Sequence, residues 1–377
     1  MGRGAEDADV VVVGAGFAGL ALAHVAAAAG MSVIVLERRS ETATEGAGVT
    51  LQANGLSVLE RLGVLDEALA VGHRVTVARQ CTPSGRVLAE FHYDEIDHRH
   101  AYLLPVERAP VVSLLARRLP AGATLRLDAP VEALLHEGGV VSRGEPVRAR
   151  WVVGADGVNS VVREALGARS RDRTGPYRYV VGLAPVAPRD EVAHVYCGDG
   201  WADGVMPNHE RTYFFDYLTG ESAGAVERRD FDAWRAAYAR RIPDGERIAG
   251  ALRSFDDVSV LSGRTHRAVP RARREVVLIG DAAAAVHPHS GQGANLALEE
   301  GLALGRALAS RDDAAIEACV RALDARRRRM VPWSILVGRS LDAPNLAWRA
   351  VRAASYAPVR VPFARRALMR RHMGIDW

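Results

Sequence analysis

Lysine is absent from the sequence: all 49 residues in the Lys and Arg total are arginines. This absence excludes a lysine Schiff base, a P-loop lysine and any catalytic lysine. Cysteine is scarce as well, because only Cys81, Cys197 and Cys319 occur, too few and too scattered for a disulfide framework or a cysteine-rich metal site. We therefore expect a protein that works in the reducing cytoplasm.

The sequence also has no large excess of one charge, because 49 arginines and 45 acidic residues give a net charge of +4. The arginines are scattered, apart from a run at 326–329 that fits a helical pattern. We interpret that run as a solvated helix face, because a nucleic-acid-binding surface would need clustered charge with stacking aromatic residues. The sequence accordingly predicts no nucleic-acid partner.

The apolar stretch at 10–30 lacks the features of a signal peptide or a membrane helix. Acidic residues precede it where a signal peptide would be basic, and three glycines and His24 interrupt it. We predict no membrane span. With 49% apolar and 25% charged residues over 377 positions, the chain is expected to be globular, with one large domain or two closely joined ones.

Strand and helix patterns near the two ends predict an α/β fold. Residues 9–13 and 31–37 are short apolar, β-branched runs without polar alternation, which is typical of strands buried on both faces of a parallel sheet. A helix rich in alanine and leucine is expected between them, at 17–29, and completes a βαβ unit. Further buried strands are expected at 151–155 and 275–279, with long helices from there to the C-terminus.

The middle of the sequence predicts a second, mostly antiparallel sheet. Alternating segments such as RTYFFDYL, from Arg211 to Leu218, and glycine-containing loops extend over 177–255. Strands are also expected within 75–93 around a turn at 83–86, and helices at 54–70, broken at Gly63, and at 109–119. One domain (1–73, 100–172 and 265–340) is therefore predicted to be interrupted by another (74–99 and 173–264), with a C-terminal helical segment at 341–377.

The first chemical motif is GAGFAG, from Gly14 to Gly19, which fits G-x-G-x-x-G between a predicted strand and a predicted helix. Glu37 closes the next strand, as in a dinucleotide-binding fingerprint. Gly14 permits the tight turn, Gly16 lets the backbone approach a pyrophosphate, and the N-terminus of the helix stabilises the phosphate charge. This motif alone leaves open whether the ligand is NAD or FAD.

Two later motifs place an acidic residue at the end of a strand, ahead of a helix. They are WVVGADGVNSVVR, ending at Arg163, and VVLIGDAAAAVHPHSGQGAN, which ends at Asn295 and contains His287 and His289. The two histidines lack a third metal ligand at recognisable spacing, so we expect no metal and favour loop histidines that shape a pocket or take a substrate proton. Asp156 in the first motif is also a candidate cap of the following helix.

Together these motifs resemble one known family, the FAD-dependent single-component (class A) monooxygenases of the para-hydroxybenzoate hydroxylase type. The resemblance also includes GAGVTL from Gly46, Asn54 and LGVLD from Leu62, and Arg108 ahead of a helix, all in family order along nearly the whole chain. It implies a Rossmann-like, GR2-type FAD-binding domain interrupted by a β-sheet substrate domain. One departure is Ala284, which stands where the family commonly has histidine. Its small side chain is expected to widen the adjacent space, and Ala284→His is expected to be tolerated if it only restores a common residue.

The resemblance also implies which residues bind the cofactor. The glycine-rich turn, Glu37 and Arg38 would hold the ADP half of FAD, Arg108 the pyrophosphate or ribityl region, the backbone of Val131 the adenine, and Asp281 a ribityl hydroxyl. Backbone N–H groups at 291–295 would meet the flavin pyrimidine edge, and Asp156, with Gly157 and Arg163, would contact FAD and NAD(P)H. The full predicted set is Gly14, Ala15, Gly16, Phe17, Ala18, Gly19, Glu37, Arg38, Arg39, Gly48, Arg108, Val131, Asp156, Asp281, Pro288, Gly291, Gly293, Ala294 and Asn295.

The predicted substrate pocket combines the middle sheet with the histidine loop. Alternation puts Tyr213, Phe215 and Tyr217 on one face of their strand, which is expected to face the flavin-side cavity, although plain sheet packing is the alternative for each of them. The other face carries Phe214, Asp216 and Leu218. From the loop, the candidates are His287, Pro288, His289 and Gly291.

The function implied by the resemblance is an NAD(P)H- and O2-dependent monooxygenation of an aromatic or polycyclic small molecule, with FAD carrying the chemistry and no protein nucleophile required. Epoxidation or Baeyer-Villiger oxygenation, and a redox-inactive FAD-binding accessory protein, are the alternatives. Halogenases of related fold need an active-site lysine, which this chain lacks. We expect a monomer or homodimer.

Overall fold

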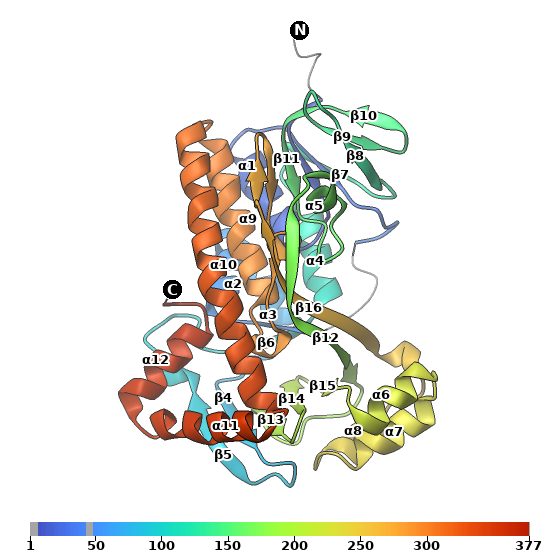
Figure 1. Cartoon of the computed structure of the whole chain (residues 1–377), viewed down its shortest axis with the longest axis vertical. Coiled ribbons are helices and arrows are strands. Elements are labelled where there is room, and N and C mark those ends of the chain that lie inside the picture. The colour runs from blue at the N-terminus through green and yellow to red at the C-terminus, as the bar shows by residue number, and fades with distance from the viewer. Residues whose placement is uncertain (1–6, 43–47, 377) are drawn as a thin grey trace.

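The computed structural model describes residues 7–42 and 48–376, without the side chains of 172–176. Gly46, one of the residues that carry the resemblance, lies outside the described residues. An upper part is built on a six-stranded sheet and a lower part on an eight-stranded sheet (Figure 1). This arrangement confirms the predicted α/β fold with a second sheet inserted in it.

The six-stranded sheet of the upper part has the order β17-β18-β11-β1-β2-β7 and is parallel except for β17. Alternate residues of β1 pack on opposite faces: Val10 and Val12 join the core under helices α1 and α9, while Val11 and Val13 join a second core under the small sheet β10-β9-β8. Burial on both faces explains why these strands are continuous apolar runs. The strands are β1 (Ala8–Val13), β2 (Val33–Leu36), β7 (Ala123–Arg126), β11 (Ala149–Gly154), β17 (Ala272–Arg273) and β18 (Val276–Leu278), and the small sheet comprises β8 (Val131–Leu134), β9 (Val140–Ser142) and β10 (Glu145–Val147).

Helices α1 (Phe17–Ala28) and α9 (Gly293–Ala309) pack closely against one another over this sheet. A Cβ at Gly301 of α9 would lie 2.3 Å from the carbonyl oxygen of Ala18, so glycine is needed for this close approach. The remaining elements of the upper part are α2 (Ala53–Arg61), α3 (Leu65–Ala70), α4 (Arg108–Arg117), α5 (Val161–Ala165) and the two-stranded sheet β3 (Gly48–Leu51) and β6 (Leu104–Glu107).

The eight-stranded sheet has the order β19-β16-β12-β15-β14-β13-β4-β5 and is antiparallel except where β13 meets β4. It confirms the predicted, mostly antiparallel second sheet. The prediction was wrong for residues 220–250, which form three helices, because tertiary packing of their apolar side chains on the sheet outweighs a weak local pattern. The strands are β4 (Val77–Cys81), β5 (Val87–His92), β12 (Arg169–Ala184), β13 (Val192–Cys197), β14 (Ala202–Asn208), β15 (Arg211–Tyr217), β16 (Ser259–Val269) and β19 (Ala284–Ala285), and the helices are α6 (Gly220–Glu227), α7 (Phe231–Ala239) and α8 (Gly245–Gly250).

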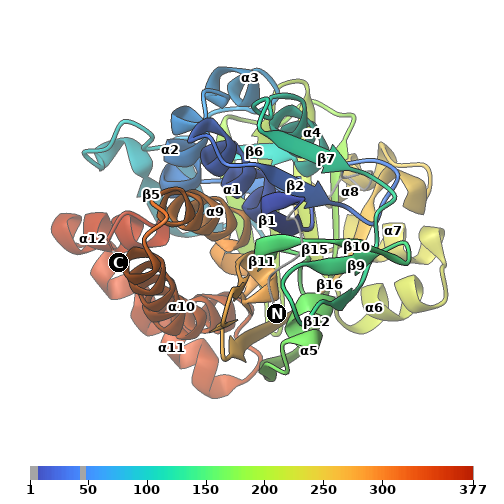
Figure 2. The ribbon, with the colours of Figure 1, turned by 90° about the horizontal axis from the view of Figure 1, so that it is seen from above.

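Two strands and one helix join the upper and lower parts. β12 and β16 pair along most of their length, so the domain boundaries predicted near 172 and 264 fall inside these strands. α10 (Asp313–Asp342) runs down the length of the molecule, and α11 (Leu346–Val359) and α12 (Pro362–His372) follow it in the lower part (Figure 1). Figure 2 shows α10 beside α9, on the side opposite α6 and α7. Among the described helices, none has both the length and the hydrophobicity needed to cross a bilayer.

Candidate cofactor and substrate site

A cavity of about 1320 Å³ lies between the six-stranded sheet and the eight-stranded sheet. Arg39, Val158 and Asp281 enter it from segments that follow the carboxyl ends of β2, β11 and β18. Ligands of open α/β sheets bind at this end of the strands. Because single drug-sized ligands occupy roughly 300–1,000 Å³, this cavity has room for a cofactor and a second molecule.

The glycine-rich turn after β1 is shaped by close backbone contacts. Gly14 has a φ of +106°, and a Cβ on it would lie 2.5 Å from the carbonyl oxygen of Ala155. A Cβ on Gly19 would lie 2.1 Å from the carbonyl oxygen of Gly14. Helix α1 then begins without a side-chain cap or an acidic residue in its first turn, so its N–H groups are available to an anion.

Glu37, at the end of β2, fixes this turn in the described structure. Its carboxylate accepts hydrogen bonds from the backbone N–H groups of Ala15 at 2.9 Å and Arg39 at 3.1 Å. The backbone N–H of Ala129 donates to the Glu37 carbonyl at 2.8 Å, which brings the segment leading to Val131 against the same strand end. The turn, Glu37 and Val131 are therefore neighbours, as the predicted ADP-binding role requires.

Arg108 and Asp281 bring opposite charges to the cavity. Arg108, at the start of α4, makes no ion pair with a described residue, and burial lowers the pKa of its guanidinium. Asp281 is exposed to the cavity, and the surrounding protein reduces its solvation and so raises the pKa of its carboxyl against the opposing effect of Arg327 and Arg108. A half-buried cation without an ion pair, close to the start of α1, fits the phosphates of a dinucleotide.

Beneath the Gly280–Asp281 turn lies a buried ion cluster that the sequence did not predict. The Glu300 carboxylate accepts from the backbone N–H of Gly280 at 2.6 Å and from Nε of Arg327 at 2.8 Å, and it pairs with Arg271 at 2.7 Å. Burial alone would raise the pKa of Glu300, but the two guanidinium groups lower it to about 2. The interpretation of 326–329 as a solvated face was therefore wrong for Arg327, which is fully buried, because α10 packs against α9 along that face.

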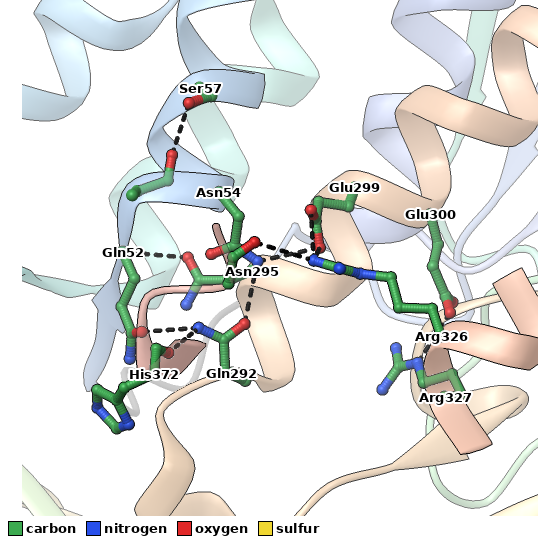
Figure 3. Close-up of polar contacts among 12 residues, drawn as sticks. Gln52, Asn54, Ser57, Gln292, Asn295, Glu299, Glu300, Arg326, Arg327 and His372 are labelled. Atoms are coloured by element: carbon green, nitrogen blue, oxygen red, sulfur yellow. Dashed lines mark hydrogen bonds and ion pairs between the residues drawn. The ribbon is translucent and has the colours of Figure 1, made fainter. Parts of the chain in front are cut away.

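A second polar cluster holds the turn ahead of α9 (Figure 3). The side chain of Asn295 accepts from the backbone N–H of Gln52 at 2.9 Å and donates to the carbonyl of Gly291 at 2.7 Å. Gln292 donates through Nε2 to the Gln52 side chain and to the His372 carbonyl, both at 2.7 Å. Asn295 therefore acts through the turn, since its own side chain is fully buried away from the cavity.

The turn itself faces the cavity with small residues. Gly291, with a φ of +63°, Gly293 and Ala294 line it, and a Cβ at Gly293 would meet no atom within 4 Å. Helix α9 starts here without a side-chain cap, so the free N–H groups and the helix dipole favour negative charge at this edge. A reduced flavin gains electron density at its pyrimidine edge, which fits this arrangement.

The Asp156 motif lies next to the cavity, but the Asp156 side chain does not line it. The Asp156 carboxylate accepts from the backbone N–H of Val161 at 2.8 Å and from the Ser160 hydroxyl at 2.5 Å, so it caps α5. Arg163 donates to the carbonyl of Ala282 at 3.2 Å and thereby ties this motif to the Gly280–Asp281 turn. Val158, between them, lines the cavity.

The eight-stranded sheet supplies an aromatic wall. Tyr213 and Phe215 of β15 line the cavity, and Tyr213 donates to the carbonyl of Gly48 at 3.3 Å. A Cβ on Gly48 would lie 1.8 Å from the Tyr213 ring, so this glycine makes room for the wall. On the other face of β15, Phe214 and Asp216 pack against α7 as the alternation predicts.

The two histidines of the loop have different surroundings. His289 lines the cavity, with Nε2 3.2 Å from the Ala202 carbonyl and 3.4 Å from the Tyr179 hydroxyl. His287 does not line it: its ring packs on Tyr177, with centroids 4.7 Å apart. Burial lowers the pKa of His289 to about 4 and that of His287 to about 2, so both are neutral at pH 7. Over 7–42 and 48–376 there is no cluster of three His, Cys, Asp or Glu able to hold a metal.

Of the predicted site residues, Tyr213, Phe215 and nine others line the cavity. The rest lie behind it or along the glycine-rich turn. Tyr217 contacts the His289 ring from behind, at 5.7 Å between centroids. The nine are Arg39, Gly48, Arg108, Asp281, Pro288, His289, Gly291, Gly293 and Ala294, whereas Gly14, Ala15, Gly16, Phe17, Ala18, Gly19, Glu37, Arg38, Val131, Asp156, Tyr217, His287 and Asn295 do not line it.

The glycine cradle, the unpaired Arg108 and the uncapped starts of α1 and α9 together fit an FAD molecule, so fold and site define a flavoprotein. Residues 7–335 match the family described as FAD binding domain. The chain belongs to this family, and it is an FAD-dependent monooxygenase.

Known proteins similar to this chain are monooxygenases. Kynurenine 3-monooxygenase of Salinispora arenicola is 32% identical over 357 residues, covering 85% of this chain and 76% of that protein. Rifampicin monooxygenase of Streptomyces venezuelae is 28% identical over 314 residues, covering 81% of this chain, which spans 64% of the relative's length. The crystal structure of a variant of PqsL from P. aeruginosa has a TM-score of 0.80 at 25% identity, covering 93% of this chain and 99% of that one.

Proposed function

We propose that this protein uses NAD(P)H and O2 to hydroxylate an aromatic or polycyclic small molecule. One observation carries the proposal: the same cavity is lined by the predicted flavin cradle, including Arg108, Asp281 and Gly293, and by the aromatic wall that includes Tyr213 and Phe215. Bound FAD, reduced by NAD(P)H, supplies the activation of O2. The protein binds and orients the cofactor and the substrate, and it keeps water away from them.

The cradle provides binding and electrostatic support for the cofactor. Arg108 and the start of α1 would favour the pyrophosphate charge, and Asp281 would accept hydrogen bonds from ribityl hydroxyls. The buried Glu300 holds the backbone of Gly280 and so fixes the position of Asp281. The N–H groups at Gly293 and Ala294 favour electron density on the flavin edge.

The aromatic wall orients the substrate. Tyr179, Tyr213 and Phe215 offer ring faces and edges for stacking against an aromatic ring. At this wall the hydroxyl of Tyr179 can donate to or accept from a substrate hydroxyl, while Nε2–H of the neutral His289 donates to the Ala202 carbonyl and holds the ring in place. A contact with the Tyr179 hydroxyl directs the substrate ring and holds its hydroxyl proton at a defined place.

We expect the protein to act in the cytoplasm, as a monomer or homodimer, on a small molecule without a nucleic-acid partner. The described cysteines are all free thiols, which is consistent with a reducing compartment. NAD(P)H is expected to bind transiently, because the sequence has only one dinucleotide fingerprint.

The decisive experiment is a screen of NAD(P)H oxidation by the purified protein over a broad aromatic panel. A flavin spectrum is expected, and a true substrate should accelerate flavin reduction and give a product heavier by one oxygen atom. The product's ring structure then separates hydroxylation from epoxidation and Baeyer-Villiger oxygenation. Protein that takes up no FAD, or that releases only hydrogen peroxide with the whole panel, would contradict the proposal.

A variant pair tests the role of the wall. Tyr179→Phe removes a hydroxyl at the cavity, whereas Tyr238→Phe removes one that is buried on the far side of the sheet. We expect the first to raise KM for a phenolic substrate about tenfold, the worth of one hydrogen bond in a closed site, and to leave FAD binding unchanged. Equal kinetics in the two variants would remove Tyr179 from the site.

A further inference from the structure

A second cavity, of about 810 Å³, lies beside the first, under helix α11. Its walls come from the β4–β5 turn at 82–88, from the β13–β14 turn at 197–201, and from α11 with Arg360. Neither the fold nor the proposed oxygenation uses this space. α11 packs against β5 in the lower part of the molecule (Figure 1).

The charges in this cavity are strongly unequal. Arg86, Arg349, Arg352 and Arg360 line it, and Asp199 is the one carboxylate among the lining residues. Asp199 is shared, since it lies 3.1 Å from Nε of Arg349 and 3.6 Å from a terminal nitrogen of Arg352. Arg86 and Arg360 are exposed to solvent and have no ion pair with a described residue. The cavity therefore has two guanidinium groups at its edge without a carboxylate partner.

Arg352 is held mainly by backbone carbonyl groups, and it shares the Asp199 carboxylate with Arg349. Its guanidinium donates to the carbonyl oxygens of Gly198 at 2.7 Å and Leu341 at 3.1 Å, and only 14% of its side chain is exposed. A guanidinium fixed by backbone carbonyls keeps its positive charge and a defined orientation. It is therefore preorganised toward an anion and not simply solvated.

The second cavity also has an aromatic surface and a shared wall. The Trp201 indole lines it, backed at 4.2 Å by the guanidinium of Arg241, and a Cβ on Gly198 would collide with that indole. Arg352 and Tyr356 line both cavities, so an occupant of the second cavity contacts side chains that also face the first.

We propose that this basic cavity, defined by Arg86, Trp201, Arg349, Arg352 and Arg360, binds an organic anion through its phosphate or carboxylate groups. Planar guanidinium groups pair with phosphate and carboxylate oxygens in two-bond geometry, and a recess lined by one sign of charge concentrates the opposite sign. Two sources share this chemistry: the phosphates of the nicotinamide dinucleotide, and an anionic group on the substrate.

The test measures binding of inorganic pyrophosphate to the FAD-loaded protein by titration calorimetry, at low and at high salt. Saturable binding that weakens with salt is expected. The variant Arg86→Ala/Arg360→Ala removes two side chains without an ion pair and should weaken binding about tenfold or more. The matched control is Arg117→Ala/Arg329→Ala, which makes the same change of charge at two exposed positions outside both cavities and should bind like the wild type.

Steady-state kinetics of the same variants separate the two sources. A raised KM for NADPH assigns the cavity to the dinucleotide phosphates, and a raised KM for acid-bearing substrates with unchanged NADPH kinetics assigns it to the substrate. The proposal is overturned if pyrophosphate does not bind to the wild type at low salt, or if the Arg86→Ala/Arg360→Ala variant binds it as tightly as the control.

Discussion

Glu300 of α9 and Arg327 of α10 form a fully buried ion pair, with Oε1 and Nε 2.8 Å apart. The other carboxylate oxygen of Glu300 accepts from the backbone N–H of Gly280, directly before Asp281. The pair therefore links helix packing to the position of a predicted cofactor-binding residue. A terminal nitrogen of Arg271 lies 2.7 Å from the same oxygen, so two guanidinium groups share the Glu300 carboxylate.

Breaking this pair should destabilise the protein and loosen the cofactor site. Arg327→Met removes one of two cations from a buried carboxylate, and we expect a loss of about 3 kcal/mol in the free energy of unfolding, at the lower end because Arg271 remains. Urea unfolding measures this change. Arg329→Met, at an exposed position on the same helix, is the control, and equal stability of the two variants would contradict the assignment.

Asp281→Ala should weaken FAD binding. It removes a charged acceptor from the cavity, worth roughly 1.5–3 kcal/mol, which corresponds to about tenfold to hundredfold in the dissociation constant. Titrating apoprotein with FAD and following flavin fluorescence measures it. Asp232→Ala, at an exposed position on α7, should bind FAD like the wild type. Unchanged FAD affinity in Asp281→Ala would show that this carboxylate makes no cofactor contact.

Ala284→His should destabilise the fold, contrary to what the sequence led us to expect. The Ala284 side chain does not widen the cavity: it is buried in an apolar cluster with Leu296, Met330 and Val331. A larger ring there costs about 1–3 kcal/mol through overpacking. Thermal unfolding should show a lower Tm for Ala284→His than for Ala318→His, which places the same residue on an exposed helix surface. A wild-type Tm would mean that the cluster can rearrange.

Asp342→Asn should change how stability depends on pH. Burial raises the pKa of Asp342 to about 6 in the folded protein, against an ordinary value of about 3.8, so between these values the native state binds more protons than the unfolded state. The contribution of the protonated Asp342 carboxyl to the free energy of unfolding is fully present below about pH 4 and is lost as the pH rises through about 6. A shift of about two units corresponds to about 3 kcal/mol.

The measurement compares urea unfolding of Asp342→Asn and wild type from about pH 4 to about pH 7. The variant lacks this titration, so its stability relative to wild type should rise by up to about 3 kcal/mol across that range. Other titrating groups cancel in the difference, because both proteins contain them. A pH-independent difference, like that expected for the exposed Asp313→Asn, would place the carboxyl of Asp342 in contact with water.

The elements that could be predicted are those whose signals are local. β1 and α1 lie where their apolar runs place them, and the turn of Gly14 requires a positive φ that only glycine adopts at low cost. The alternation in β15 correctly separated Tyr213 and Phe215 from Phe214. Helices α6 to α8 were missed because they are stabilised by packing of their apolar side chains on the sheet. The local sequence pattern does not reveal such long-range contacts.

Residue roles at the site divide in the same way. Asp281 and Gly293 line the cavity as their motif implies, whereas Asn295 supports the turn from behind. Asp156 caps a helix, and its predicted contacts with FAD and NAD(P)H stay predictions. A motif fixes which residues sit near a ligand, but not whether a given side chain points to it or to the backbone.

The parallel sheet, the dinucleotide turn and the family could be predicted from the sequence, because each depends on short-range backbone requirements that few residue types satisfy. Which of the arginines are buried ions depends on how the helices pack, and no local pattern reports it. Arg327 and Arg329 are two positions apart in one run, yet one pairs with Glu300 in the core and the other faces solvent. The same holds for the second cavity, whose arginines come from distant segments that only packing brings together.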